Sequence, residues 1–325
     1  MSKKNIAVIT GGDSSEYVVS VRSGANVFNA IDRSLFNPFL VRIRGNEWIV
    51  LDGDNKVVDV DKSDFSFVIN GRKIKTDYAY IIIHGTPGED GILQGYFGML
   101  GISYSSCGVQ SAALTFNKYF CNNYLRSFDI PIAKSIRVTL GEKYNASQIV
   151  EELGLPLFVK PNAGGSSFGI TKVKRLEKLV EAINKAMDES PEVIIEQFID
   201  GNEFSCGVLR TKSRKIVFPV TEVIPQNEFF DYEAKYKPGL ADEITPARLA
   251  VDLTHKIQSL SSRIYDLCSC RGIVRIDYIL KNETFYFLEV NTTPGMTETS
   301  FIPQQIKAMG LNLTDLLTEI INDQV

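Results

Sequence analysis

The residues best suited to chemistry lie near the C-terminus, in two short runs rich in β-branched and aromatic side chains. Ile273–Leu280 and Thr284–Val290 flank a polar tripeptide, a pattern that predicts a hairpin of two strands. The charged and amide residues within or beside this hairpin are Arg275, Asp277, Glu289 and Asn291. Because both runs are mostly apolar, we expect these side chains to be largely buried, where a charge is tolerated only with a partner.

Three of these residues offer only oxygen atoms as ligands. The carboxylates of Asp277 and Glu289 and the amide oxygen of Asn291 suit Mg²⁺, while Arg275 is a planar cation that can hold a phosphate. The turn that follows contains Gly295, which lets backbone amides approach a ligand closely. A charge-laced exposed hairpin is the alternative, but the carboxylates lie inside apolar runs instead of alternating with them.

A second candidate site lies near the middle of the chain. Leu155–Pro161 predicts a strand that delivers Lys160, and Asn162–Gly169 follows it with three glycines and two serines. Such a hairpin tip can fold over a polyphosphate with its backbone N–H groups. It is not a Walker A loop, because the lysine precedes the glycines and a strand follows them. An ordinary flexible hairpin is the alternative.

These segments resemble a known family. RIDY at 275–278, FLEVNTTPGMT at 287–297 and HGTPGEDG at 84–91 are similar to ATP-grasp ligases, above all to the D-alanine–D-alanine ligase family, and the resemblance extends nearly end to end. It implies ATP-dependent joining of two D-alanines through a D-alanyl phosphate, for peptidoglycan precursor synthesis. ATP is then a co-substrate, two Mg²⁺ or Mn²⁺ ions assist, and the chain forms a homodimer. Ligases that join D-alanine to D-serine or D-lactate are the alternative, as is a nucleotide-binding module without catalysis.

The resemblance also implies roles for single residues. It gives catalytic roles to Glu16, Ser166, Tyr236, Arg275 and Gly295, and amino-acid binding to His84, Lys235 and Ser300. It gives ATP contacts to Lys118, Lys160, Ser167, Glu196, Gln197, Phe198, Ile199 and Glu203, and metal ligation to Asp277, Glu289 and Asn291. The chain departs from the family at Asn117, where an aspartate usually precedes the lysine.

Several of these residues have a simpler interpretation from sequence alone. Glu16 precedes a predicted helix, where a carboxylate compensates the helix dipole. A surface lysine such as Lys118 is usually solvated, and Glu196 and Glu203 suit a solvated strand end. Glu89 and Asp90 also lie at a helix start, so their charge is explained without catalysis, and their roles stay open. We expect His84 to order its loop, because the implied chemistry needs no imidazole.

The order of the elements predicts an α/β protein with a three-domain ATP-grasp architecture. A buried strand at Asn5–Thr10, a glycine turn and a helix from Ser20 open a doubly wound parallel-sheet domain, which we assign to residues 1–106. Two α+β domains that clamp ATP follow at 107–204 and 205–325. We expect one helix over Ser111–Phe128, another over Ala247–Cys268, and a lid within Glu222–Ile244.

Bulk composition narrows the classes of partner. A net charge of −4 and a pI near 5.5 leave no electrostatic footprint for nucleic acid. No apolar run reaches the length of about eighteen residues that a membrane span needs. The five cysteines are odd in number and irregularly spaced, which favours reduced thiols over disulfides or zinc. The start of the chain leaves no room for a signal peptide, so we expect a cytoplasmic protein.

Overall fold

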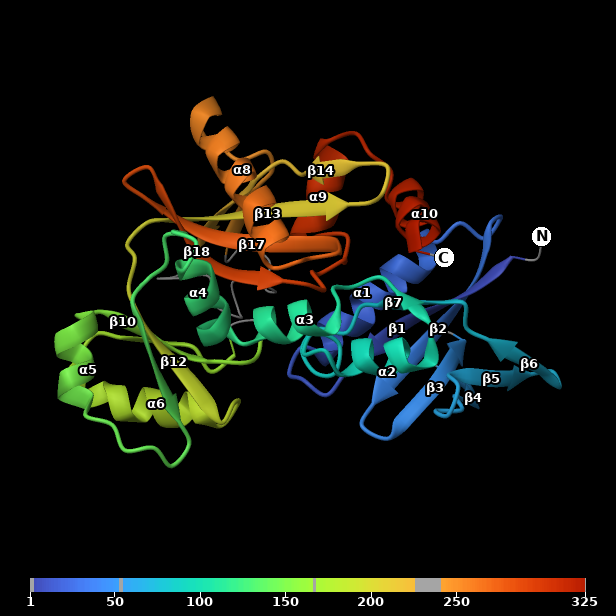
Figure 1. Ribbon diagram of the computed structural model, residues 1–325, viewed down its shortest axis with the longest axis horizontal. Helices are drawn as coiled ribbons and strands as arrows, with labels where there is room; N and C mark the ends of the chain where they lie inside the picture. Colours follow the sequence, from blue (N-terminus) through green and yellow to red (C-terminus); the bar gives the residue numbers. More distant parts are fainter. Residues whose placement is uncertain (1–2, 53–54, 166–167, 226–240, 325) are drawn as a thin grey trace.

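The computed structural model describes residues 3–52, 55–165, 168–225 and 241–324. The molecule is elongated, with the N-terminal sheet at one end and the sheet built from residues 135–197 at the other (Figure 1). The sheet built from residues 202–291 lies between them, beside the helices of the C-terminus. The expected mixture of α/β and α+β units is therefore present.

The N-terminal sheet has six strands in the order β4-β3-β2-β1-β7-β8. They are β1 (Lys4–Gly11), β2 (Phe36–Arg44), β3 (Glu47–Asp52), β4 (Asn55–Asp59), β7 (Tyr78–Ile81) and β8 (Ser103–Tyr104). β2, β1, β7 and β8 run parallel, and β3 and β4 continue antiparallel. A separate hairpin joins β5 (Ser66–Ile69) to β6 (Arg72–Lys75). Helices α1 (Tyr17–Ala30) and α2 (Ile92–Leu100) contribute to cores on opposite faces of the sheet.

The middle sheet is antiparallel throughout, in the order β11-β10-β12-β9. Its strands are β9 (Ser135–Thr139), β10 (Leu157–Pro161), β11 (Thr171–Val173) and β12 (Glu192–Gln197). The helices α5 (Ala146–Leu153) and α6 (Leu179–Met187), with the 3₁₀ turn at Leu176–Lys178 before α6, complete this unit. The apolar stripe of α6 and the sheet share a core of their own.

The third sheet has the order β16-β15-β13-β17-β18, with β14 on β13. Its strands are β13 (Asn202–Arg210), β14 (Lys215–Val217), β15 (Thr221–Pro225), β16 (Ala241–Ile244), β17 (Gly272–Lys281) and β18 (Thr284–Asn291). The helices of this region are α8 (Val251–Leu267), α9 (Phe301–Ala308) and α10 (Leu313–Gln324). The hairpin predicted from the sequence is β17–β18, and it brings Asp277 opposite Glu289 and Arg275 opposite Asn291.

Three helices differ from the sequence prediction, and one of them, α8, begins at Val251, four residues after the expected Ala247. The single helix expected over 111–128 is in fact two helices: α3 (Val109–Phe116), which lies against β18, and α4 (Lys118–Arg126), which packs into the core of the third sheet. Asn117 breaks the run, because its backbone is extended and its side chain accepts the N–H of Phe120 as a helix cap. α1 begins three residues earlier than expected, and the Ser20 hydroxyl binds Gly11 and Ile82 instead of capping a helix.

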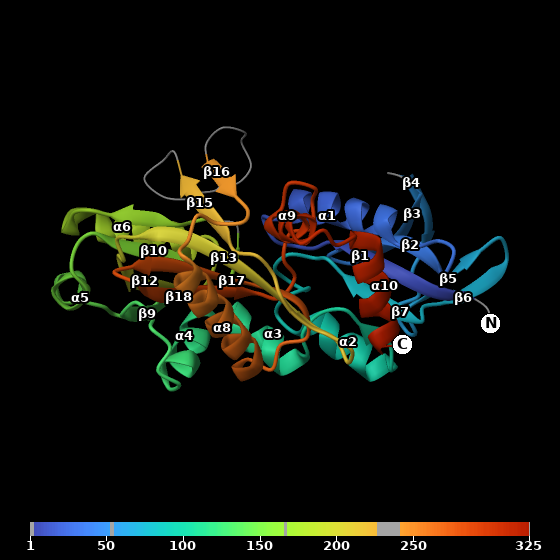
Figure 2. The same cartoon turned by 90° about the horizontal axis from the view of Figure 1, so that it is seen from above.

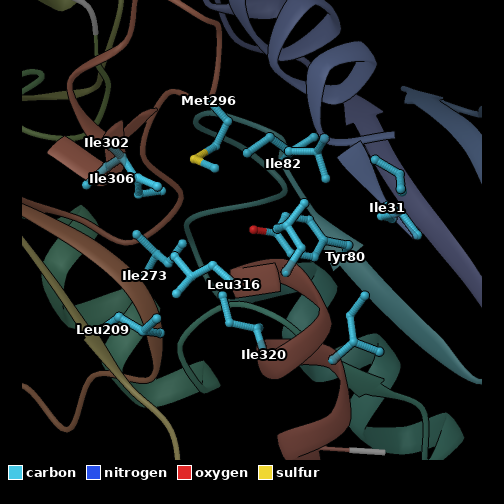
Figure 3. Packing of buried hydrophobic residues seen from close by; sticks show 14 of the residues in the cluster. Ile31, Tyr80, Ile82, Leu209, Ile273, Met296, Ile302, Ile306, Leu316 and Ile320 are labelled. Carbon is cyan, nitrogen blue, oxygen red and sulfur yellow. The ribbon is translucent and has the colours of Figure 1, made fainter. Parts of the chain in front are cut away.

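One hydrophobic core joins the two ends of the chain. Figure 3 shows Tyr80 and Ile82 facing Leu316 and Ile320 of α10, with Met296 beside them. Both cartoon views place α10 next to the N-terminal sheet (Figures 1 and 2). The N-terminal and C-terminal parts therefore share buried side chains, and this packing fixes the walls of any site between them.

This shared core predicts a large cost for removing one of its side chains. Leu317 on α10 is fully buried, so Leu317→Ala should lower the free energy of unfolding by about 2–5 kcal/mol through lost burial and a cavity. Urea unfolding followed by circular dichroism measures it. The control is Leu140→Ala, at a leucine that is 67% exposed, which should change the same quantity by less than about 0.5 kcal/mol. Equal effects of the two variants would contradict this core.

Candidate active site

A cavity of about 410 Å³ lies between the N-terminal and C-terminal parts. Its acidic wall residues are Glu16, Glu89, Glu243, Glu289 and Glu298. The basic ones are Arg22 and Arg275, and the segment from Thr293 to Phe301 supplies most of the rest. Carboxylates outnumber cations along its wall, so the cavity suits ligands that bring positive charge.

Asp277 holds the polar end of the β17–β18 hairpin together. It is 5% exposed and receives three donor side chains. The Arg275 guanidinium donates from Nε and from one terminal nitrogen at 2.8–3.2 Å. Ser205 Oγ donates at 2.7 Å and Asn291 Nδ2 at 3.0 Å. Ser205 lies directly opposite Asp277 on β13, so it completes a set that the sequence alone did not indicate.

The three expected metal ligands lie at one end of the hairpin. Asp277 and Glu289 face each other across the strands, and Asn291 uses its amide nitrogen on Asp277. Among the described residues no three His, Cys, Asp or Glu side chains gather as a metal site, so the oxygen set is two carboxylates and one amide. That donor chemistry fits Mg²⁺, with the condition that Asp277 exchanges part of its hydrogen bonding for the metal.

The glycine loop is the segment that follows β10 and contains Gly164 and Gly165. It lies close to the N-terminal part at Glu16 and to α4 at Lys118. Lys118 Nζ donates to the Gly164 carbonyl at 2.6 Å and lies 3.4 Å from Glu289. A Cβ at Gly165 would collide with the Glu16 carboxylate, so only glycine permits this close approach. Lys118, Gly164, Gly165 and Glu289 line a smaller pocket next to the main cavity. The structure thus brings Lys118, Glu16 and the glycine loop together.

Lys160 and Glu196 form a buried ion pair on adjacent strands of the middle sheet. Their charged atoms are 2.7 Å apart, and Asn122 Nδ2 donates to the other oxygen of Glu196. Burial alone lowers the pKa of the Lys160 ammonium, but the charge and hydrogen bond of Glu196 outweigh it, so this pKa is raised. Glu196 is therefore not the solvated strand end that the sequence left open.

The other residues expected at the nucleotide lie between the end of β12 and the first residues of β13. Gln197 ends β12 and is exposed, while Phe198 and Ile199 are half-buried. The Phe198 ring lies 5.8 Å from Phe158 and carries the Lys172 ammonium 4.0 Å from its centre. Glu203 is the second residue of β13, and its charge contributes to the raised pKa of Lys160.

His84 is buried in the first-domain wall of the cavity. Burial lowers the pKa of its imidazole, although the charge of Glu16 partly opposes this. Its backbone carbonyl accepts the Ser14 hydroxyl at 2.7 Å, and its Nε2 lies 3.4 Å from the Ser23 hydroxyl. A neutral, hydrogen-bonded imidazole agrees with the expectation that His84 orders its loop.

Glu89, whose role the sequence left open, connects the two walls of the cavity. Its two oxygens accept the N–H of Gly85 at 2.8 Å and the N–H of Thr293 at 3.1 Å. Burial raises the pKa of this carboxyl to about 7, the nearby charge of Glu16 adds to the rise, and these hydrogen bonds partly oppose it. The helix-start interpretation misses this role, because the contact with Thr293 spans 204 residues.

The segment before α9 forms the opposite wall. Gly295 faces Ser300, so that a Cβ at Gly295 would lie 2.9 Å from Ser300 Oγ. The Ser300 hydroxyl is hydrogen-bonded to the N–H and hydroxyl of Thr297 at the start of α9. Four further expected site residues, Ser166, Ser167, Lys235 and Tyr236, lie outside the described residues.

Comparison with known proteins identifies this arrangement. A family model described as "D-ala D-ala ligase N-terminus" matches residues 5–107, and one described as "D-ala D-ala ligase C-terminus" matches residues 124–322. The chain belongs to the D-alanine–D-alanine ligase family. The resemblance carried by the hairpin and the two loops is thereby confirmed.

Individual members of the D-alanine–D-alanine ligase family match over nearly the whole chain. The D-alanine–D-alanine ligase of Azobacteroides pseudotrichonymphae is 53% identical over 98% of this chain and 99% of its own, and that of Bacteroides fragilis is 51% identical over 99% of each. Among solved structures, a D-Ala:D-Ser ligase from Enterococcus faecalis has a TM-score of 0.88 at 34% identity, covering 99% of both chains. The D-alanine–D-alanine ligase of Bacillus anthracis complexed with ATP has a TM-score of 0.79 at 29% identity, covering 99% of this chain and 97% of its own. These likenesses confirm the expected ATP-grasp fold class.

The described helices of this family member include none that is long and apolar enough to span a bilayer. The longest of them, α8, mixes charged and apolar residues along its 17 positions.

The Glu89 carboxyl predicts a pH-dependent stability for this ligase family member. Its folded-state pKa of about 7 exceeds the ordinary value of 4.5. The folded protein therefore keeps a proton between pH 4.5 and 7 that the unfolded chain has lost, and this stabilisation fades as the pH rises through that window. We expect Glu89→Gln to reduce the loss of stability between pH 5 and pH 7.5, measured by urea unfolding without nucleotide or Mg²⁺.

The comparison uses the slope of stability against pH, because the substitution also removes a hydrogen bond at every pH. Asp90→Asn, at the half-buried neighbour whose side chain accepts the N–H of Ile92, is the matched control and should keep the wild-type slope. An unaltered slope in Glu89→Gln would contradict the raised pKa.

Proposed function

We propose that this protein joins two D-alanines to D-alanyl-D-alanine with ATP, through a D-alanyl phosphate, for peptidoglycan precursor synthesis. Curated relatives with 51–53% identity over nearly the full length carry the name D-alanine–D-alanine ligase. The observation that carries the proposal is the cavity between the two parts, where Glu16, Arg275 and Gly295 meet beside the glycine loop. The proposed reaction is that of an ADP-forming carboxylate–amine ligase, the class to which a D-alanine–D-alanine ligase belongs.

The first step needs an anionic phosphate brought onto an anionic carboxylate. Such a transfer requires positioning and neutralisation of charge more than covalent help. Lys118, Lys160 and Arg275 supply positive charge, and Glu16 holds the ammonium of the first D-alanine. We propose two Mg²⁺ or Mn²⁺ ions, held by Asp277, Glu289 and Asn291, which when bound would neutralise the β- and γ-phosphates. Arg275 leaves Asp277, at least in part, to reach a phosphate or the reacting carbonyl.

The second step is attack of the second D-alanine's amine on the acyl phosphate. Arg275 and the N–H of Gly295 face the oxyanion of the tetrahedral intermediate, and Ser300 with Lys235 binds the second carboxylate. The resemblance implies a link from Tyr236 through Ser166 to Glu16 that closes the site, and the first two of these residues lie outside the described ones. Water must be excluded, because it would hydrolyse the acyl phosphate. The loss of one oxyanion donor typically costs about 10²–10³ in rate.

The nucleotide binds between the middle sheet and the third sheet in this proposal. Gln197, Phe198 and Ile199 contact adenine, Ser167 a phosphate, and Glu203 the ribose. Glu196 acts through its ion pair with Lys160. We keep the division into 1–106, 107–204 and 205–325 as the proposed domain order, and note that α4 packs with the core of the third sheet.

Ligation of D-alanine to D-serine or D-lactate gains no support from the curated relatives, whose names specify D-alanine twice. The deciding experiment supplies ATP, Mg²⁺ and D-alanine and measures ADP together with the products. We expect one ADP released per D-alanyl-D-alanine formed, and no ADP without D-alanine. ADP release that does not depend on D-alanine would refute the proposed reaction.

The metal assignment predicts the behaviour of one carboxylate. Glu289→Gln keeps the shape of the side chain but removes the charge that Mg²⁺ needs, so we expect ligation to fall by about 10² or more. Thermal unfolding should stay cooperative. Glu283→Gln, in the exposed turn of the same hairpin, is the control and should keep full activity. Wild-type turnover of Glu289→Gln at saturating Mg²⁺ would remove Glu289 from the site.

We also propose a homodimer that works in the cytoplasm. α2 and the start of α3 expose three large apolar side chains: Ile92 is 61% exposed, Met99 83% and Val109 48%. A group of exposed apolar side chains on neighbouring elements marks protein contacts more often than isolated side chains do. Met99→Lys should therefore shift the protein to monomer in sedimentation velocity runs at micromolar concentration. The control is Leu140→Lys, at an exposed leucine of the middle unit, which should sediment with the wild-type distribution of monomer and dimer. If Met99→Lys also sediments like the wild type, the dimer contact does not involve this surface.

A further inference from the structure

One carboxylate in the cavity wall has no role in the mechanism above. Glu243 lies on β16, the edge strand of the third sheet, and faces the same cavity as Arg275 and Ser300. Adjacent residues of a strand point to opposite faces. Its neighbour Asp242 is exposed and acts on Arg248, while Glu243 is half-buried and reaches α9. The strand thus directs Glu243, and not Asp242, into the site.

Gln304 fixes the direction of this carboxylate. Its Nε2 donates to Glu243 Oε2 at 2.6 Å and to the carbonyl of Thr299 at 2.7 Å. Gln304 lies in the first turn of α9, one turn beyond Ser300, so the amide ties Glu243 to the wall where the second carboxylate is placed. Among the described residues only Gln304 donates to Glu243, which leaves the other carboxylate oxygen available to a ligand.

The reaction brings two ammonium groups into a partly dehydrated cavity, and each needs an anion beside it. Glu16 is assigned to the first ammonium. Glu289 is assigned to the metal, Glu89 is bound by two backbone N–H groups, and Glu298 is exposed at the mouth. The second amino acid therefore lacks a partner for its ammonium among the assigned residues, and Glu243 is the half-buried carboxylate left on its side of the cavity.

We propose that Glu243 binds the ammonium of the second amino acid and selects an amine-bearing substrate at that subsite. This inference rests on the proposed function, because it takes the two subsites from it. Arg275 lines the same cavity as Glu243, so the carboxylate shares a wall with the residue that faces the reacting carbonyl. Glu243 and Ser300 then hold the two ends of one amino acid, and Gln304 sets the distance between them. Burial raises the pKa of Glu243, but the hydrogen bond from Gln304 and the charge of Arg275 oppose this and favour the anion.

The test separates activation of the first D-alanine from capture of the second. Hydroxylamine replaces the second amino acid as nucleophile: its nitrogen bonds to the acyl carbon, the carbon–oxygen bond to phosphate breaks, and a hydroxamate and phosphate form. Glu243→Gln should leave ADP release and hydroxamate formation at the wild-type rate. Dipeptide synthesis should show a KM for the second D-alanine raised by about tenfold or more, the effect of losing a charge-assisted hydrogen bond.

Three variants provide the comparison. Asp242→Asn, on the opposite face of the same strand, should match the wild type in both assays. Glu243→Asp retains the charge and should recover part of the affinity lost in Glu243→Gln. Gln304→Leu removes the orienting amide without touching the carboxylate, and should raise the same KM by a smaller factor even where Glu243→Gln folds poorly.

The outcomes are distinct. A normal KM for the second D-alanine in Glu243→Gln would overturn the inference, and so would an equal fall in hydroxamate and dipeptide formation, which indicates a structural role. An equal loss in Glu243→Asp and Glu243→Gln would overturn the role of the charge. If the wild-type protein forms neither hydroxamate nor dipeptide, the proposed function itself fails.

Discussion

The buried carboxylate of Asp277 is the interaction on which the site depends. A charge inside an apolar hairpin is stable only when its oxygens are fully engaged. Arg275 on the same strand, Ser205 on β13 and Asn291 on β18 provide this engagement. The same contacts fix the guanidinium and the amide at the mouth of the cavity. Loss of any one donor would therefore disturb both the proposed metal site and the cation proposed to face the substrates.

The walls around this hairpin are held by packing between distant parts of the chain. The core shared by the N-terminal sheet and α10 sets the relative position of the two parts. Glu89 then connects their polar surfaces through Gly85 and Thr293. Gly165 approaches Glu16 so closely that no side chain fits between them. The cavity is thus bounded by the N-terminal part and the β17–β18 hairpin, with the glycine loop beside it.

The excess of negative charge in the cavity wall matches the charges of the ligands proposed for it. Five acidic side chains face two arginines along its wall. Amino acids bring ammonium groups and nucleotides bring metal ions, so an excess of carboxylates is neutralised only when the ligands are bound. Burial, with the charge of Glu16 adding to it, raises the pKa of Glu89 within this cavity. The location of Glu243 extends this pattern to the second amino acid.

The sequence alone was sufficient for the hairpin, the glycine loop and the family, because these depend on local periodicity and on residue types at short spacing. Asp277, Glu289 and Lys160 could be selected in this way. The break at Asn117 could not, since a capping side chain and a helical run look alike in one dimension. The contacts of Ser205, Glu89 and Glu243 were decided only by the tertiary structure, because strand pairing and helix packing bring together groups that lie 61 to 204 residues apart.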